Sequence, residues 1–492
     1  MNTPVSDVVT EHVDLAELER IVTVQRAAHH RDGDPSAEIR RDRINRLMLA
    51  ILEVADDLAT ALAQDYGARP TGLSKLFDVL AWVNDAKDTR ERLEEWMRPV
   101  HLDGPVPAFI QQKPKGVVGV MGAWNFPVTL TVQPALPALA AGNRVILKFP
   151  ETHPRTGKIF ADAVGRHFDE SELAVVVGDL ATAQAFSALP LDHLLVTGSP
   201  AAGRAIAAAA GRNLVPLTLE LGGKNPVVLG RDADIAVAAH RIALGRMMNG
   251  GQICLCPDYV FVPRERLEVF LTALQGAFRE IFPTYLDNAG AVSMVNDRNY
   301  DRVIGLIDDA VAKGATKISV TAEHENDLLP ARESRLIPPT ILLDVPDEAA
   351  VSREEIFGPV IAVYSYSDVR EAVSHITSRP SPLGAYWFGA ENGDYSYLLA
   401  YTNSGGVTRN DVFAHQVVPG APFGGVGGSG YGAYHGKFGF DEFTHRRTVA
   451  TVDGDRSFAD GAVGAGVADA EVEAGFDQAI AAELAAVRKL LE

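Results

Sequence analysis

The stretch that decides the fold is LLVTGSPAAG at residues 194–203. Its first part, Leu194–Thr197, is a short apolar run of the kind that forms buried strands. Pro200 suits the first position of a helix, and the alanine-rich sequence that follows it favours helix formation. The stretch therefore predicts a strand, a tight turn at Gly198-Ser199 and a helix in direct succession.

The same alternation of strand and helix extends upstream. Three further strand candidates are Val117–Val120, Val145–Leu147 and Ala174–Val177, and the segments between them are long enough for crossover helices. This order predicts an α/β fold with a doubly wound parallel sheet. Such sheets bind ligands beyond the carboxyl ends of their strands, so the turn at Gly198 and Ser199 is a candidate pyrophosphate site. A tight connection without a ligand explains the same turn equally well.

A second α/β unit is predicted from about Gly222 to Asn410. Its expected strands are Tyr259–Val262, Val360–Tyr364 and Ala385–Phe388, and its expected helices lie near Arg264–Ile281 and Asp368–Thr377. The glycine-rich residues 422–430 follow it. They indicate unusual backbone angles or close approach, not a nucleotide loop, because no clear strand-to-helix transition brackets them.

The segments outside these two units have other sequence patterns. Residues 1–115 are mostly helical in pattern, with apolar positions every three or four residues in Leu15–Ala28 and Ile39–Leu62. The proline-rich segment Pro99–Pro114 indicates an exposed arm or hairpin. Residues 452–475 have the composition of a flexible linker. The last segment, Phe476–Glu492, predicts an amphipathic helix that docks on its own or a sister subunit.

Composition limits the classes of function. At 492 residues the chain is expected to form two or three domains. The net charge of −19 argues against a nucleic-acid partner, since phosphate binding needs a basic surface. No apolar run is long enough to span a bilayer and the amino end lacks signal-peptide features, so we expect a cytoplasmic protein without a membrane partner. Two cysteines are too few for a disulfide framework or a structural zinc site, and we expect no metal.

Two glycine-rich motifs carry reactive side chains. The segment LELGGK at 219–224 contains Glu220, and NGGQICLC at 249–256 contains Cys254 and Cys256. A thiolate is the strongest side-chain nucleophile near neutral pH, and a carboxylate shielded from water is suited to general-base catalysis. Considered without its neighbours, a cysteine such as Cys254 is more often a small buried apolar residue, and a glutamate such as Glu220 is more often a surface carboxylate. Together they indicate acyl chemistry with a water-dependent second step. In an extended segment Cys256 would face the opposite way, so we interpret it as structural or as a residue liable to oxidation.

Seven motifs in order resemble the aldehyde dehydrogenase superfamily over residues 15–450, of the class 3 type and most similar to bacterial coniferyl aldehyde dehydrogenases. They are AWNFP at 123–127, LK at 147–148 with Glu151, TGS at 197–199 with Gly203, LELGGK at 219–224, GQIC at 251–254, EEIFGPV at 354–360, and PFGG at 422–425 before YHGK at 434–437.

The resemblance implies a fold and a division of the chain. It implies a Rossmann-type, doubly wound NAD(P)-binding domain at 1–98 and 115–221 and a second α/β, catalytic domain at 222–411. A small oligomerisation arm would comprise 99–114 and 412–451, followed by the linker and helix of 452–492. The expected assembly is a homodimer.

The resemblance also implies the catalytic roles. Cys254 would attack the aldehyde carbonyl and later carry a thioester, which Glu220 would help water to hydrolyse. The side-chain amide of Asn125 and the backbone N–H of Cys254 would stabilise the oxyanion. Asn125 could instead cap a helix that begins near Pro127. The mechanism needs neither His415 nor His435, which we interpret as structural.

The family pattern further implies a nicotinamide cofactor. Lys148 and Glu151 would contact the adenosine ribose, and Gly198, Ser199 and Gly203 the pyrophosphate. Glu355 and Phe357 would lie at the nicotinamide ribose, and Trp124 and Gly222 complete the predicted cofactor-binding set. Glu151 favours a free ribose 2′-hydroxyl and Lys148 tolerates a phosphate, so NAD is expected first and NADP remains possible.

Three positions depart from the family pattern and affect the expected cofactor and aldehyde pockets. Phe149 adds an aromatic residue near the expected adenine site, Phe126 replaces a common tyrosine, and Ile253 replaces a common threonine. The substrate is expected to be a small, hydrophobic aldehyde, aromatic and coniferaldehyde-like or of medium chain length. Two alternatives are a coenzyme A-acylating dehydrogenase, against which Glu220 argues, and a non-catalytic protein that retains the fold.

Overall fold

The computed structural model describes residues 12–104, 106–452 and 469–491, together with the single residues 454, 457, 463 and 467. The chain divides into two compact units. The larger unit comprises Met1–Met97 and Lys113–His445, and the smaller comprises Arg98–Gln112 and Arg446–Glu492. All residues predicted to take part in catalysis or cofactor binding belong to the larger unit.

The first sheet of the larger unit has six strands in the order β15-β7-β6-β3-β4-β5. These are β3 (Val117–Met121), β4 (Arg144–Phe149), β5 (Leu173–Val177), β6 (His193–Gly198), β7 (Leu217–Leu221) and β15 (Gly430–Tyr431). All neighbours pair in parallel except β15, which is antiparallel to β7. The four strands expected from the sequence are confirmed as β3 to β6, whereas β7 and β15 were not predicted.

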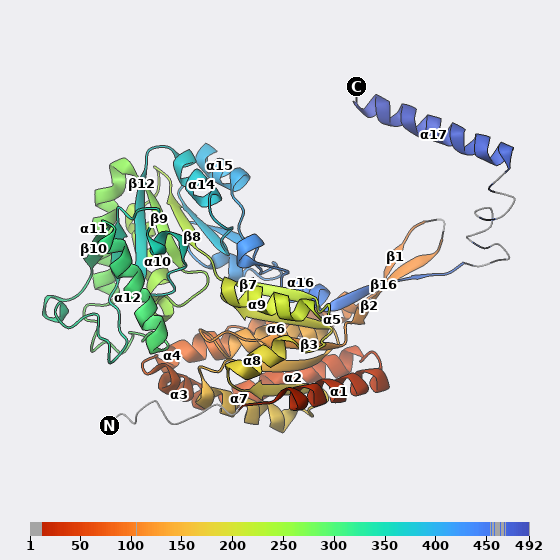
Figure 1. Cartoon of the computed structure of the whole chain (residues 1–492), viewed down its shortest axis with the longest axis horizontal. Helices are drawn as coiled ribbons and strands as arrows, with labels where there is room; N and C mark the ends of the chain where they lie inside the picture. Colours follow the sequence, from red (N-terminus) through yellow and green to blue (C-terminus); the bar gives the residue numbers. More distant parts are fainter. Residues whose placement is uncertain are drawn as a thin grey trace. The chain divides into compact units, whose positions relative to one another are not determined.

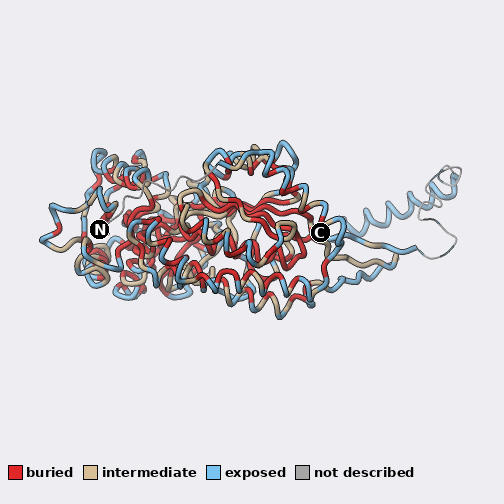
Figure 2. The backbone as a smooth tube through the Cα atoms, turned by 90° about the horizontal axis from the view of Figure 1, so that it is seen from below, coloured by how far each residue is buried: buried red, intermediate tan, exposed pale blue. Residues whose placement is uncertain are grey.

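Helices cover both faces of this sheet (Figure 1). Alternate strand residues point to opposite faces: Val118 and Val120 of β3 pack among one set of helices, and Val117 and Met121 among the other. The first set is α2 (Ala37–Leu52), α3 (Ala55–Tyr66), α5 (Val83–Met97), α6 (Thr129–Ala140) and α7 (Pro154–His167), and the second is α1 (Leu15–Asp32), α8 (Leu180–Ser187) and α9 (Pro200–Gly211). The predicted doubly wound arrangement is therefore confirmed, and Figure 2 shows its strands buried between the two layers.

A second sheet in the same unit has seven strands in the order β10-β11-β12-β9-β8-β13-β14. They are β8 (Asn225–Leu229), β9 (Pro257–Pro263), β10 (Thr316–Ser319), β11 (Thr340–Leu343), β12 (Val360–Tyr366), β13 (Gly384–Phe388) and β14 (Gly406–Arg409). Only β10 is antiparallel to its neighbour. The associated helices are α10 (Ile235–Met247), α11 (Leu267–Ile281), α12 (Asp297–Ala312), α13 (Ala350–Arg353), α14 (Val369–Thr377) and α15 (Gly393–Tyr401). The predicted strands of this unit are confirmed as β9, β12 and β13.

The helical region differs from the sequence-based expectation in two places. The pattern over Ile39–Leu62 does not form one continuous helix, because the chain turns at Val54 (φ −112°, ψ 20°) between α2 and α3. The segment after α3 forms α4 (Thr71–Ser74) and then a π-helix at Lys75–Leu80 before α5, and no local pattern predicted that π-helix.

The smaller unit contains a three-stranded sheet and a terminal helix. The antiparallel strands β1 (Val100–Leu102) and β2 (Ala108–Pro114) form the hairpin expected from the proline-rich segment, and β16 (Thr444–Ala450) pairs with β2. The terminal helix α17 spans Ala470–Leu491 with all its described side chains exposed. It begins six residues inside the segment expected to be a linker, half of which lies outside the described residues.

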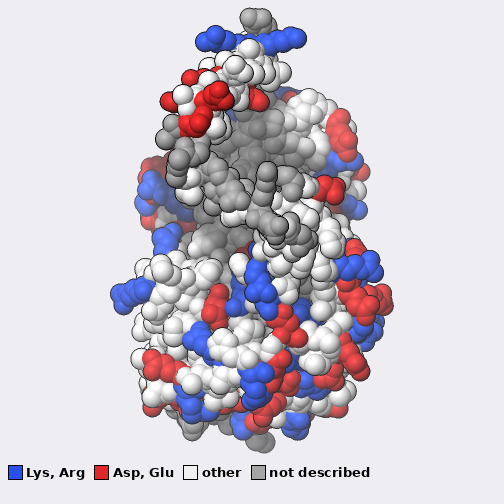
Figure 3. All heavy atoms as spheres, turned by 90° about the vertical axis from the view of Figure 1, so that its right-hand side faces the viewer, with Lys and Arg blue, Asp and Glu red and all other residues white. Residues whose placement is uncertain are grey.

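The surface and the helices bear on possible partners. On the face in Figure 3, acidic and basic side chains are interspersed. Among the helices that the structure describes, none combines the length and apolarity needed to cross a bilayer.

Candidate active site

Cys254 lies on a turn between a short 3-10 helix, Met248–Gly251, and β9. Asn249 (φ 50°), Gly250 (φ 63°) and Gly251 (φ 77°) all adopt left-handed backbone conformations, which asparagine and glycine tolerate best. At Gly251 a β-carbon would lie 2.3 Å from the carbonyl oxygen of Gly358. Glycine is therefore required at position 251, three residues before Cys254, so that this turn can approach the loop at Gly358.

Buried polar side chains fix the position of this turn. The amide of Asn225 donates to the carbonyl oxygens of Cys254 (2.7 Å) and Cys256 (3.0 Å). The guanidinium of Arg246 donates to the carbonyl oxygens of Pro257 and Gly251. The thiol of Cys256 points away, toward the Gly245 carbonyl oxygen at 3.2 Å. The structural interpretation of Cys256 is thus confirmed, and the half-buried Cys254 thiol alone is available to a substrate.

Glu220 lies on β7 and is only 3% exposed. Within the described chain neither of its carboxyl oxygens has a hydrogen-bond partner. Burial raises the pKa of Glu220 well above its ordinary value, and the nearby Gly425 amide, outside hydrogen-bonding geometry, lowers it only slightly. A buried carboxyl without a partner costs folding free energy, so its presence calls for an explanation such as a bound water or substrate.

The glycine-rich segment predicted to be structural brings the backbone close to this carboxyl. A β-carbon at Gly424 would lie 3.1 Å from Oε1 of Glu220, and one at Gly430 would lie 1.8 Å from the Leu219 carbonyl oxygen. The glycines thus allow β15 to pair with β7 directly at Glu220. The structural interpretation of residues 422–430 is confirmed.

Three ionisable groups share the site. Burial raises the pKa of Cys254 far above its ordinary value, and the negative charges of Glu355 and Glu220 raise it further. The pKa of Glu355 is raised to about 8, first by burial and then by the charge of Asp258. The structure therefore brings Glu220 and Glu355 within electrostatic range of Cys254, and burial with these two charges favours the neutral thiol.

Asn125 is buried at 4% exposure, and its side-chain amide donates to the backbone oxygen of Gln252 at 3.1 Å. The backbone carbonyl oxygen of Asn125 accepts hydrogen bonds from the Tyr66 hydroxyl (2.9 Å) and the side-chain amide of Asn249 (3.1 Å). Asn125 does not cap the following helix, because α6 begins at Thr129 after Val128 without any side-chain cap. The helix-cap alternative is therefore wrong, and the amide is held on the loop that leads to Cys254.

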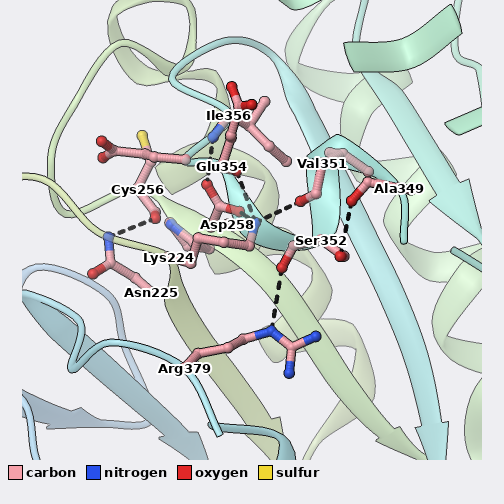
Figure 4. Close-up of polar contacts among 12 residues, drawn as sticks. Lys224, Asn225, Cys256, Asp258, Ala349, Val351, Ser352, Glu354, Ile356 and Arg379 are labelled. Atoms are coloured by element: carbon pink, nitrogen blue, oxygen red, sulfur yellow. Dashed lines mark hydrogen bonds and ion pairs between the residues drawn. The ribbon is translucent and has the colours of Figure 1, made fainter. Parts of the chain in front are cut away.

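Glu355 lies on a loop that is anchored from below by a buried ion pair (Figure 4). The ammonium of Lys224 pairs with Asp258 and also donates to the carbonyl oxygens of Val351 (2.8 Å) and Glu354 (3.2 Å). The second oxygen of Asp258 accepts from the backbone N–H of Ile356 at 2.9 Å. The backbone on one side of Glu355 is therefore held by Lys224, directly before β8, and on the other side by Asp258 of β9.

Three other residues of the predicted cofactor-binding set lie on or against this loop. A β-carbon at Gly222 would lie 2.1 Å from the Glu355 carboxyl, so only glycine fits there. Phe357 has a left-handed backbone (φ 48°), and its ring meets Trp124 edge to face at 5.2 Å between centroids. Trp124 directly precedes Asn125, so this ring contact joins the Glu355 loop to the segment that carries Asn125.

The remaining predicted cofactor residues lie at the carboxyl end of the first sheet. Ser199 caps α9 by accepting from the Ala202 N–H, and at Gly203 a β-carbon would lie 2.8 Å from Leu221. Gly198 ends β6, one residue after Thr197, whose buried hydroxyl has no hydrogen-bond partner in the described chain. An exposed helix N-terminus beside an unpartnered hydroxyl fits the phosphates of a dinucleotide.

Lys148 lies near the end of β4, and Glu151 follows the strand at the same edge of the sheet. The Lys148 ammonium donates to the carbonyl oxygens of Phe149 (2.7 Å) and Gly178 (3.1 Å), and it lies 3.8 Å from the Glu151 carboxyl. Phe149 is fully buried and packs on Phe160 at 5.0 Å between ring centroids. The position of Phe149 on β4 directs its ring into the core, so it adds no exposed aromatic surface at this edge of the sheet.

Sequence reasoning missed several residues that hold this site. Lys224 was quoted only as part of a motif, and neither Asp258 nor Arg246 was singled out. One local signal was present: the Asn249-Gly250-Gly251 sequence favours left-handed conformations. The partners of Lys224 lie far along the chain, and nothing in the local pattern identifies them.

Comparison with known proteins is consistent with this geometry. Residues 3–449 match the model of the aldehyde dehydrogenase family. A probable coniferyl aldehyde dehydrogenase from Caulobacter vibrioides is 44% identical over 457 residues, covering 91% of this chain and 93% of the relative. A dimeric, NADP-preferring aldehyde dehydrogenase from Rattus norvegicus is 37% identical, covering 87% and 93%. The substrate-bound structure of AldH from Staphylococcus aureus superimposes with a TM-score of 0.83 at 30% identity, covering 89% of this chain and 95% of that one.

Proposed function

Because this chain belongs to the aldehyde dehydrogenase family, we propose that it oxidises a hydrophobic or aromatic, coniferaldehyde-like aldehyde to the carboxylic acid through a thioester on Cys254. The observation that carries the proposal is the buried carboxyl of Glu220, which has no protein partner in the described chain and lies in electrostatic range of the Cys254 thiol. A nucleophile and a general base are the two groups that such a reaction requires.

The roles of the side chains follow from their surroundings. The Cys254 sulfur adds to the carbonyl carbon as its proton passes to Glu220 or to water, and the carbonyl oxygen becomes an oxyanion. The amide of Asn125 and the backbone N–H of Cys254 donate to that oxygen. When bound, NAD(P) would supply the acceptor for the hydride that leaves the substrate carbon. Glu220 then takes a proton from water, which attacks the thioester and releases the acid.

The cofactor proposal is NAD, with NADP as the alternative. Glu151 is half-exposed and acidic, which suits a free ribose 2′-hydroxyl. The Lys148 ammonium already donates to two backbone carbonyls, so it is poorly placed to neutralise a 2′-phosphate. The rat relative is named as NADP-preferring. A comparison of NADH and NADPH formation, with Glu151→Gln as the test variant, decides between them.

The proposed division of the chain follows the family. Residues 1–98 and 115–221 would bind NAD(P), 222–411 would carry catalysis, and 99–114 with 412–451 would form an oligomerisation arm. The hairpin β1–β2 supports the arm, since β1 is an edge strand with Val100 and Leu102 exposed. We expect a homodimer in the cytoplasm. Light scattering of the full chain and of a Val100→Glu variant tests the arm.

One experiment tests the reaction. NADH formation from coniferaldehyde, benzaldehyde and hexanal is measured for the wild type, Cys254→Ala and Glu220→Gln, with and without coenzyme A. Loss of steady-state activity in both variants and indifference to coenzyme A support hydrolytic oxidation. A requirement for coenzyme A would instead support the acylating alternative. A wild type that binds NAD yet reduces none of it would favour a non-catalytic role.

A further inference from the structure

A second carboxyl near the candidate site, that of Asp85, is not used by the proposed reaction. Asp85, on α5, accepts a hydrogen bond from the backbone N–H of Gly436 at 3.3 Å through Oδ1. Its other oxygen, Oδ2, is buried and has no hydrogen-bond partner within the described residues. The side-chain amide of Gln133, on α6, lies near this carboxyl and lowers its pKa. The site is therefore polar and only half satisfied.

Tyr434 links this carboxyl to the catalytic residues. Its buried phenol is close enough to Glu220, Cys254 and Asp85 for all three charges to raise its pKa. Its backbone pairs with Phe423, one residue before Gly424, which approaches the Glu220 carboxyl. The ring of Tyr434 also packs in the same apolar cluster as Cys254 and Phe423. Asp85, Glu220 and Cys254 thus all lie near the phenol of Tyr434.

Gly436, the backbone partner of Asp85, directly follows two residues of an aromatic cluster, Tyr434 and His435. His435 stacks on Phe423 with 5.2 Å between ring centroids, and Tyr434 meets the same histidine ring at 4.6 Å. The Nε2 atom of His435 is also buried without a hydrogen-bond partner in the described chain. An aromatic wall that ends in unpartnered polar atoms is complementary to a flat apolar ligand with a hydrogen-bonding group at its far end.

We infer that Asp85 accepts a hydrogen bond from a hydroxyl group at the end of the aldehyde opposite the carbonyl, and that it thereby selects 4-hydroxyaryl aldehydes over their deoxy analogues. This inference rests on the proposed oxidation at Cys254. A rigid aromatic aldehyde holds its two polar ends apart, and Tyr434 lies near both Cys254 and Asp85. The pKa of Asp85 is raised to about 6, mainly by burial, so the carboxyl is largely ionised above pH 7 and can accept such a bond.

The test compares 4-hydroxycinnamaldehyde with cinnamaldehyde, which differ only in the ring hydroxyl. We measure kcat/KM for both with the wild type, Asp85→Asn and Asp85→Leu. The matched control is Asp88→Asn, which changes a half-exposed carboxylate one turn further along α5. The wild type is expected to prefer the hydroxylated substrate, and Asp85→Leu to lose this preference by a factor of about 10–100, the usual value of a hydrogen bond to a charged group. The deoxy substrate is expected to change little.

Other outcomes are distinguishable. Equal changes for both substrates, or a wild type that does not discriminate between them, would overturn the role of Asp85 while leaving the proposed oxidation intact. If the wild type oxidised neither aldehyde, the proposed function would fail. Calorimetric binding of 4-hydroxycinnamate against cinnamate would still test Asp85, with equal affinities for the two acids counting against it.

Discussion

Replacing Lys224 by methionine removes the ammonium that holds the Glu355 loop while preserving most of the apolar side chain. Lys224 and Asp258 are only 9% and 2% exposed in their side chains, so the variant leaves a buried carboxylate unpaired. Breaking a buried ion pair from one side typically costs about 3–5 kcal/mol of unfolding free energy. It also releases the carbonyl oxygens of Val351 and Glu354, which flank Glu355.

The functional effect of Lys224→Met should fall on the cofactor side of the site. A misplacement of about 1 Å can reduce a rate about 100-fold, so we expect a loss of that order in NADH formation, with a raised KM for NAD. Hydrolysis of 4-nitrophenyl acetate needs only a nucleophile and a base, and it should fall far less, since the hydrogen bonds of Asn225 to the cysteine turn do not involve Lys224.

The assay follows both reactions in the wild type, Lys224→Met and the control Lys158→Met, which breaks an exposed pair with Asp162. The control should match the wild type in both reactions. Equal losses of NADH formation and ester hydrolysis in Lys224→Met would refute the reasoning, because they would indicate general damage to the fold. An unchanged KM for NAD with a normal rate would refute it as well.

Two further predictions concern the backbone and pH. Gly251→Ala should destabilise the protein by at least about 1–3 kcal/mol and abolish activity, because the new methyl group meets the Gly358 carbonyl oxygen in a left-handed conformation. Gly276→Ala, in open space on α11, should instead stabilise by about 0.5–1 kcal/mol in chemical denaturation; similar effects of the two would contradict this account. Burial raises the pKa of both Glu220 and Glu355, the latter to about 8, so the folded state holds protons that the unfolded state releases. Stability from these groups is present at low pH and is lost as pH rises to about 8, so Glu355→Gln should flatten the fall in melting temperature between pH 5 and pH 8, and an unaltered profile would count against a buried carboxyl.

Much of the fold could be predicted because continuous apolar runs mark fully buried parallel strands. The strands β3 to β6 and β9 follow that rule. Strand β7 was missed because Thr218 and Glu220 interrupt its apolar residues, although both are buried. A polar residue in a buried strand is unfavourable for folding alone, and here it marks the proposed site of chemistry.

The candidate site could be predicted only as separate motifs. Cys254 and Glu220 were identified from local sequence, since glycine-rich segments with a reactive side chain are informative by themselves. The positions of Asp85 and Tyr434 could not be, because their relation depends on the packing of elements about 350 residues apart, as in the Asp85–Gly436 hydrogen bond. The direction of Phe149 likewise depended on its register in β4, which a run of apolar residues does not reveal.

The central claim is that Cys254 carries an acyl group that Glu220 helps to hydrolyse. The most direct measurement is the intact mass of Glu220→Gln after mixing with NAD and coniferaldehyde, with peptide mapping of the adduct. The account predicts an acyl adduct on Cys254, a burst of about one NADH per site and slow turnover, reduced about 10²–10⁴-fold without the general base. Normal turnover without any adduct, or an adduct on a residue other than Cys254, would contradict it.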